Sequence, residues 1–441
     1  MIESSATGLN GNMITAGVIL VAAYVLIFTE VMHRMHAAVI GAVVMVGVGL
    51  YAGFYSQEQA IQSIDANTIF LLAGMMMMVA ILRKTGGFDY LAIHIARHTA
   101  HRPRRLLVYL TFAVSVISMF LDNVTTVIIF APLTVLICRM AKLNPMPYLM
   151  AEAMLSNIGG IATLVGDPPN IMIGSAAKID FNSFLFHMGP VVVVVWAVIV
   201  TMILAVFRKE LTPPAAFTGK IELNAEKAIH DSRSLKWVLV GLSLIVAMFF
   251  VHHHFHLYPS YVVFVGVALT LALIRPDPET LLKDVEWTVL LFFSALFVIV
   301  GGVEGSGLLA LIGNGISAVS GDPEALLLTC ILLMWVAAIL SAIVDNIPFT
   351  VTMIPIVLSL ETQGMNVTPL WWALALGVGL GGNGSHIGAT ANIICVAESE
   401  RCEIPEARIT AMLWLRKGLP IMLVSLTVAS AVFALFFDFF L

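Results

Sequence analysis

The sequence has little charge. Only 11% of its 441 residues are Asp, Glu, Lys or Arg, whereas 60% are hydrophobic and the mean hydropathy is +0.99. A soluble domain cannot bury this much apolar surface. Because apolar runs of spanning length recur from end to end, the composition predicts an all-α polytopic membrane protein. The small net charge of −5 and the lack of a basic stripe with interleaved aromatic residues give no sign of a nucleic-acid partner.

Cysteine and the motifs of common enzymes are also scarce. The four cysteines form no C-x-x-C pair and stand beside no histidine cluster, so they read as small buried hydrophobes rather than metal ligands. No nucleophile–base pair, HExxH motif or Walker A motif is present, which argues against an enzyme and against ATP-driven pumping by this chain alone. A separate cytoplasmic ATPase partner stays open. No cofactor is expected beyond Na⁺ or H⁺ as a coupling ion.

Ten apolar runs have the length of a full crossing. They span 13–31, 36–54, 68–82, 149–176, 184–207, 236–252, 258–275, 286–303, 370–397 and 419–440. Basic residues cluster after the first, third and seventh runs, in the central loop and before the last run. If these loops face the cytoplasm, Lys178 is the single exception among the 22 basic residues. This distribution predicts a protein of the cytoplasmic (inner) membrane with both termini outside.

Two further apolar segments, 105–138 and 325–360, are too long for one crossing and have a polar break in the middle. The first has Arg105 at one end and Arg139 and Lys142 at the other, so both of its ends favour the cytoplasm. The second has acidic ends and lies in a stretch, 284–400, without Lys or Arg. We therefore expect two re-entrant hairpins that enter the membrane from opposite sides.

The second half repeats the first at an offset of about 220 residues. The tip Leu121-Asp122-Asn123-Val124 returns as Val344-Asp345-Asn346-Ile347, and the glycine-rich stretch Gly159–Asn170 returns as Gly381–Asn392. Five crossings per half make the halves run in opposite directions, which predicts an inverted-topology repeat. The predicted domains are 1–207, with hairpin 105–138 and broken helix 149–176, a cytoplasmic linker at 208–235, and 236–441, with hairpin 325–360 and broken helix 370–397.

The breaks are the predicted site of solute chemistry. Backbone groups that are freed inside a membrane must be buried in protein or line a wet cavity, where they bind cations and hydroxyl groups. We expect a hairpin tip and a break from each half to converge near the midplane. The candidate ligands for a solute or ion are Asp122, Asn123, Thr126, Asn157, Thr163, Asn170, Asp345, Asn346, Asn383, Ser385 and Asn392, with sodium an alternative ligand at Asn123 and Asn346.

The acidic members are candidate proton carriers. Asp122 and Asp345 lie deep in apolar sequence, where ionisation is costly. Asp167 is a further candidate, and Ala389 occupies its position in the second repeat. Each has a structural alternative: the tip aspartates could serve only as helix caps, and Asp167 could serve only to shape a turn. The amides could satisfy irregular backbone, and the hydroxyls could bond within a helix. His386, which replaces Leu164, could likewise be a structural hydrogen-bonding group.

The motifs FLDNVTTVIIFAPLT, SNIGGIATLVGDPPNIMIG, VDNIPFTVTMIP and LGGNGSHIGATANIICVA resemble those of the ion transporter superfamily. The similar branch holds ArsB arsenite efflux pumps, NhaD sodium/proton antiporters and the melanosomal P protein. The resemblance covers essentially the whole chain. It implies a scaffold domain, a moving transport domain with an elevator-type mechanism, and a homodimer. More distant relatives carry dicarboxylates with sodium and have Ser-Asn-Thr at each tip, where this chain has Asp-Asn-Val and Asp-Asn-Ile.

The change from Ser to Asp bears on the solute. Two extra carboxylates in a low-dielectric site, without Lys or Arg in either motif, disfavour a polyanion and favour a cation, a proton or a neutral polyol. Proton-coupled efflux of arsenite or antimonite is therefore the first hypothesis, because arsenite near neutral pH is mainly a neutral trihydroxide. Sodium/proton exchange is the second hypothesis and sodium-coupled carboxylate transport the third. An ion channel fits the two inverted hairpins less well than alternating access does.

Overall fold

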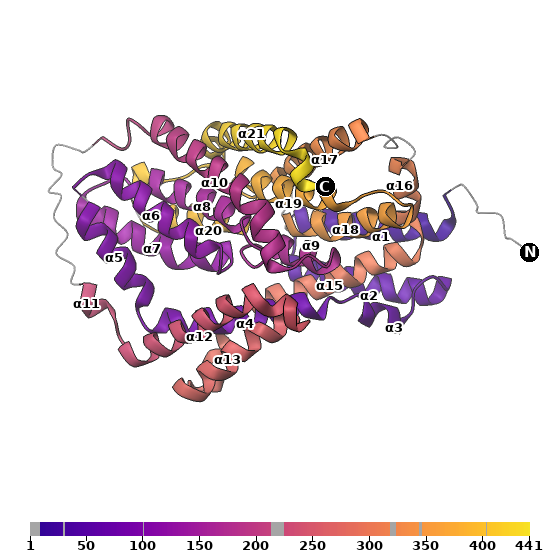
Figure 1. Ribbon diagram of the computed structural model, residues 1–441, viewed down its shortest axis with the longest axis horizontal. Helices are drawn as coiled ribbons and strands as arrows, with labels where there is room; N and C mark the ends of the chain where they lie inside the picture. The colour runs from indigo at the N-terminus through magenta and orange to yellow at the C-terminus, as the bar shows by residue number, and fades with distance from the viewer. Residues whose placement is uncertain are drawn as a thin grey trace, which may run out of the picture.

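The computed structural model describes residues 9–29, 31–99, 101–212, 225–317, 323–343, 346–402 and 404–441. These residues form helices joined by turns and contain no strand, as Figure 1 shows. Among them, eight helices are long and apolar enough to cross a membrane, and three shorter apolar helices accompany these. The prediction of an all-helical, multi-pass membrane protein is therefore confirmed.

The helices of the first half follow the predicted segments closely. They are α1 (Gly11–Phe28), α2 (Arg34–Ala52), α3 (Gln57–Gln62), α4 (Ala66–Lys84), α5 (Gly87–Thr99), α6 (Pro103–Ser118), α7 (Asn123–Ala141), α8 (Met146–Gly160), α9 (Pro168–Ala176) and α10 (Phe181–Val206). The predicted hairpin 105–138 is the pair α6–α7, and the predicted broken helix 149–176 is the pair α8–α9. The short helix α11 (Ala225–Ala228) lies in the central linker.

The helices of the second half come in the same order. They are α12 (Ser232–Val251), α13 (Pro259–Ile274), α14 (Pro278–Lys283), α15 (Trp287–Gly305), α16 (Leu308–Ser317), α17 (Pro323–Ile343), α18 (Asn346–Thr362), α19 (Thr368–Gly381), α20 (Thr390–Arg401) and α21 (Ala411–Leu435). Four short 3₁₀ turns complete the described chain: η1 (His252–Phe255), η2 (Gly382–Gly384), η3 (Pro405–Ala407) and η4 (Phe437–Phe440). The second hairpin is α17–α18, and the second broken helix is α19–α20.

The turn that follows the third long helix of each half illustrates this correspondence. Gly86, between α4 and α5, has φ of 79°, and Gly307, between α15 and α16, has φ of 84°. This left-handed conformation favours glycine because it has no Cβ. In both halves the turn starts a short amphipathic helix, α5 or α16.

Each hairpin packs against the broken helix of its own half through glycine. A Cβ built on Gly159 of α8 would overlap with the carbonyl oxygen of Ser115 on α6, and one built on Gly381 of α19 would overlap with that of Ala338 on α17. The two glycines, and the two residues whose carbonyl oxygens they contact, are related by nearly the same offset along the chain. Backbone therefore lies directly against backbone where each break leaves its first helix, and this contact holds the breaks beside the hairpin tips.

Two predicted boundaries are wrong. The last crossing was predicted at 419–440, whereas α21 spans Ala411–Leu435. Its first turns carry Arg416 and Lys417, and the Lys417 ammonium pairs with the Glu210 carboxylate at 2.8 Å, so the charged segment is helical as well. The linker prediction also runs too far, because α12 begins at Ser232, where Asp231 accepts hydrogen bonds from the first-turn amides.

Candidate functional site

The centre of the candidate site is a chain of buried amides that joins the two halves. Asn157, near the end of α8, accepts a hydrogen bond from Asn123 Nδ2 at 3.0 Å. Its own Nδ2 donates to Asn383 Oδ1 at 2.9 Å and to Asn392 Oδ1 at 3.1 Å. All four side chains are at most 3% exposed. The first hairpin, the first broken helix and the second broken helix therefore meet at one residue.

One polar atom in this chain of amides has no hydrogen-bond partner among the described residues. The Oδ1 atom of Asn123 is buried and accepts no hydrogen bond within the described part of the protein. Buried polar atoms are normally paired, and an unpaired one calls for an explanation such as a bound water, ion or ligand. Asn123 therefore offers an acceptor to a hydroxyl group or a cation at the tip of the first hairpin.

The two breaks are held by the same bonds in each half. Asn170 Nδ2 donates to the carbonyl oxygens of Gly160 and Thr163, both at 3.0 Å. Asn392 Nδ2 donates to the carbonyl oxygens of Gly382 and Ser385, at 2.7 and 2.8 Å. These carbonyls have no helical partner where α8 and α19 end. The predicted structural alternative thus describes Asn170, whereas Asn392 also accepts the bond from Asn157.

The matched hydroxyls bind the hairpins to the breaks. Thr163 Oγ1 donates to the carbonyl oxygen of Met119, and Ser385 Oγ donates to that of Ala342. Met119 follows α6 and Ala342 lies near the end of α17, so both carbonyls stand at the inner end of a hairpin leg. Thr163 and Ser385 therefore fix the hairpin tips relative to the breaks.

The first tip is capped by its aspartate. Asp122 precedes α7 and accepts hydrogen bonds from the Thr125 amide at 2.9 Å and from Thr125 Oγ1 at 2.5 Å. Thr126, a predicted ligand, donates its hydroxyl to the Asp122 carbonyl at 2.9 Å. Asp122 as a whole residue is half-buried, and both of its carboxylate oxygens accept hydrogen bonds from Thr125. Asp345, its predicted counterpart, lies outside the described residues.

The second tip contacts the first break. Asn346 Nδ2 donates to Asp167 Oδ2 at 3.2 Å, and Asp167 is 2% exposed. Asp167 also precedes α9, whose first residues are Pro168 and Pro169. Because Ala389 occupies the matching position of the second half, this carboxylate–amide pair has no equivalent there. His386, in the second break, is partly buried.

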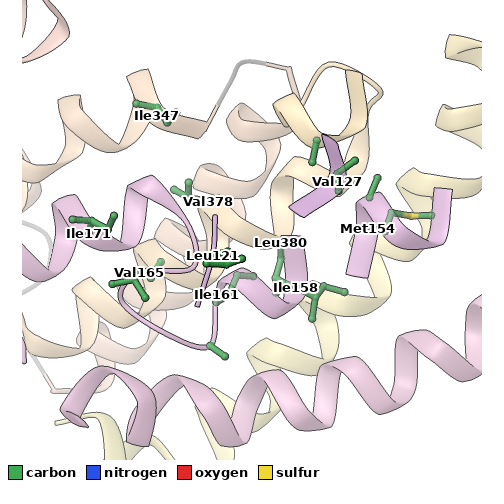
Figure 2. Packing of buried hydrophobic residues seen from close by; sticks show 14 of the residues in the cluster. Leu121, Val127, Met154, Ile158, Ile161, Val165, Ile171, Ile347, Val378 and Leu380 are labelled. Atoms are coloured by element: carbon green, nitrogen blue, oxygen red, sulfur yellow. The ribbon is translucent and has the colours of Figure 1, made fainter. Parts of the chain in front are cut away.

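The two breaks contact each other through polar amides on one side and through apolar groups on the other. On one side Asn157 contacts Asn383 through amides. Their counterparts under the repeat offset, Gly379 and Ile161, also meet, because a Cβ built on Gly379 would overlap with the Ile161 side chain. Figure 2 shows buried hydrophobic residues of this region, among them Ile158 and Ile161 of the first half and Val378 and Leu380 of the second. The polar face of the site therefore lies on one side only.

A basic side chain from outside both motifs reaches the second break. Arg34, at the start of α2, donates from Nη1 to Thr390 Oγ1 at 3.2 Å, and its guanidinium lies 5.4 Å from the Phe292 ring centroid. Thr390 is the first residue of α20. The Glu286 carboxylate, at the start of α15, interacts electrostatically with both Asp122 and Arg34. The charge next to the site is therefore mixed.

Glu152 was missed by sequence reasoning. It lies on α8, five residues before Asn157, and is completely buried. Thr134 Oγ1 on α7 donates to its Oε1 at 2.5 Å, and among the described residues its Oε2 has no hydrogen-bond partner. An acidic residue within an apolar run is a signal of function in a membrane segment. That signal was available in the sequence Met150-Ala151-Glu152-Ala153, although the second half has Leu374 at the matching position.

The site therefore offers amide and carboxylate oxygens, freed backbone carbonyls and one nearby guanidinium. The described residues contain no group of three or more His, Cys, Asp or Glu side chains that could hold a metal ion. Oxygen ligands of this kind suit hard cations and hydroxylated solutes.

Known proteins share this sequence and fold. The family described as "Citrate transporter" matches residues 24–377. An uncharacterised transporter of Mycobacterium tuberculosis is 38% identical over 95% of this chain and 97% of its own length. The human P protein is 31% identical over 94% of this chain and 58% of its own length. The YdaH transporter of Alcanivorax borkumensis has the same fold, with a TM-score of 0.58 at 14% identity over 98% of this chain and 99% of its own.

The family and the Mycobacterium tuberculosis relative are described as transporters, and together with the apolar helices described above this supports a secondary transporter of small solutes. The chain belongs to the citrate transporter family, in the P-protein-like branch of the ion transporter superfamily.

Proposed function

We propose that this protein is a proton-coupled secondary transporter and that arsenite or antimonite efflux is its activity. One observation carries the proposal: the buried amide chain through Asn157 ends at the unpaired acceptor Asn123 Oδ1, beside the carboxylate of the half-buried Asp122. A neutral trihydroxide can donate to both oxygens and accept from the amides. The carboxylate beside it supplies a group that can exchange a proton.

Two other solutes each have an observation in their favour. Sodium/proton exchange is favoured by the carboxylate–amide pair Asp167–Asn346, because both residues present oxygens to a hard cation. Carboxylate transport is favoured by the family's description and by the Arg34 guanidinium at Thr390. It is opposed by the aspartates near the tips, which repel a polyanion.

The proposed architecture is two inverted repeats, 1–207 and 236–441, joined by the linker 208–235. It is supported by the matching order of the helices, by the two glycine turns and by the duplicated amide bonds of Asn170 and Asn392. The basic loops place the linker in the cytoplasm and both termini outside. We further propose that the protein lies in the cytoplasmic membrane and forms a homodimer.

The proposed mechanism is an elevator in which the hairpins and broken helices move against the other long helices. In the described conformation, Thr390 and Asp122 of the breaks and tips face the Arg34 and Glu286 ends of α2 and α15. The basic loops assign these ends to the cytoplasm. In the proposed topology this arrangement places the buried site nearer to the cytoplasmic side.

Reconstitution tests the proposal. Purified protein in liposomes with an imposed proton gradient is offered arsenite, sodium or citrate in separate assays. We expect arsenite movement that depends on the gradient, and its loss in Asp122→Asn and Asp345→Asn, because asparagine keeps the size of aspartate but carries no proton. Asp438→Asn, at an exposed position of η4, is the control.

Sodium movement in place of arsenite would establish the exchanger, and citrate movement would establish the carboxylate transporter. Movement of no solute by well-folded protein would overturn the proposal. Wild-type coupling in both tip variants would show that the aspartates are only caps.

A further inference from the structure

Glu152 is a buried acid that the proposed site does not use. It lies between α8, α7 and α20, which pack against one another, and is completely buried. The ionisable groups facing it are the buried thiols of Cys138 on α7 and Cys395 on α20, on both of which it acts electrostatically. No Lys, Arg or His of the described residues acts on Glu152 in return.

Neither protonation state of Glu152 is well satisfied here. An ionised carboxylate without a cationic partner or water is strongly unfavourable in a dry interior. A protonated carboxyl needs an acceptor for its O–H, and Oε2 has no partner within the described chain. Thr134 serves only Oε1. A small change in the spacing of the three helices, or the entry of one water, therefore decides whether the proton stays.

The position of Glu152 links it to the solute site. It shares α8 with Asn157, the residue that joins the two halves, and five residues of helix separate the two by about 7.5 Å. Thr134 lies on α7, the same helix that begins at Asn123. Any shift of α7 against α8 when a solute binds Asn123 is therefore transmitted to the Thr134–Glu152 bond.

We propose that Glu152 carries a coupled proton through the transport cycle, in addition to the groups at the hairpin tips. The proton binds to the carboxylate at Oε2 and leaves from the same oxygen, so no other reactant is needed. In the described conformation α7, α8 and α20 pack around the buried carboxyl group and the proton is retained. It leaves when these helices separate. This inference rests on the proposed proton-coupled transport and deepens it.

The test compares wild type, Glu152→Gln and Glu279→Gln, which changes an exposed glutamate of α14, in the same liposomes. Two rates are measured from mildly acidic to mildly alkaline pH: gradient-driven arsenite movement, and arsenite exchange without a gradient. We expect Glu152→Gln to lower the rate of gradient-driven movement by about tenfold or more. A factor of ten is the change in a protonation equilibrium that one pKa unit represents. Exchange should persist and lose part of its pH dependence. Glu279→Gln should match wild type.

A permanently protonated, structural Glu152 predicts the opposite, because glutamine mimics the neutral acid. Wild-type coupling and an unchanged pH profile in Glu152→Gln would overturn the inference while leaving the proposed function intact. If wild type itself shows no proton dependence, the proposed function fails and this inference fails with it.

A second measurement covers a variant that does not fold. Wild-type protein is treated with a carbodiimide, which reacts with protonated carboxyl groups in apolar surroundings, and the Glu152 peptide is read by mass spectrometry. Modification that falls as pH rises is expected. Modification that does not change with pH would refute a titrating Glu152.

Discussion

Replacement of Asn157 by alanine should destabilise the protein more than removal of the neighbouring Ser156 hydroxyl on α8. The variant loses three hydrogen bonds, one accepted from Asn123 and two donated to Asn383 and Asn392. At about 1 kcal/mol net for each bond, the loss is about 3 kcal/mol. Buried partners left unpaired add to this cost, and water that enters the vacated space offsets part of it.

Ser156→Ala is the matched control. Ser156 is also fully buried on α8, but its hydroxyl makes one bond, to the Ala153 carbonyl at 2.8 Å, so its loss costs about 1 kcal/mol. The difference of about 2 kcal/mol corresponds to a change of roughly 30-fold in the unfolding equilibrium. Unfolding in mixed micelles with increasing SDS, followed by tryptophan fluorescence, measures it. Equal midpoints for the two variants would refute the view that Asn157 joins the halves.

The remaining predictions concern pH and topology. Burial acts to raise the pKa of Glu210, but the hydrogen bond and charge of Lys417 outweigh it and lower that pKa below its ordinary 4.5. The ion pair should therefore stabilise the protein at neutral pH by under about 1 kcal/mol. This stabilisation should be lost as pH falls through 4.5 and below. Glu210→Gln and wild type should therefore unfold at different temperatures at pH 7 and at the same temperature in acid. A cysteine placed at Ser56 should react with an impermeant maleimide from outside, whereas one at Lys220 should react only from the cytoplasm. Labelling of Lys220 from outside would contradict the proposed topology.

Much of the fold could be predicted from the sequence because two signals are local. Apolar length sets the helices, and the polar interruptions at Asp122-Asn123 and Gly159–Asn170 mark where α6–α7 and α8–α9 are divided. The start of the last crossing was harder to place, because Lys417 looked like a boundary until its partner Glu210, which is more than 200 residues away in the chain, was known.

The candidate site could be predicted in its members and not in its pairings. Asn157 and Asn383 were named from their motifs, yet only packing shows that they contact each other rather than their own repeat counterparts. Arg34 contacts Thr390 across 356 positions of sequence, a relation that no local pattern contains. Glu152 lacked a partner in the repeat, and the search for duplicated residues therefore passed over it.

The glycine contacts at Gly159 and Gly381 have a mechanical consequence. Where backbone lies against backbone, no side chain can change rotamer to absorb a displacement, and close-packed interiors transmit strain instead of yielding to it. In the proposed elevator mechanism, each hairpin and its broken helix would therefore move together as a stiff unit. The movement that a transport cycle requires would then occur at the surfaces between these units and the surrounding helices. The hydrogen bond from Arg34 to Thr390 lies at such a surface.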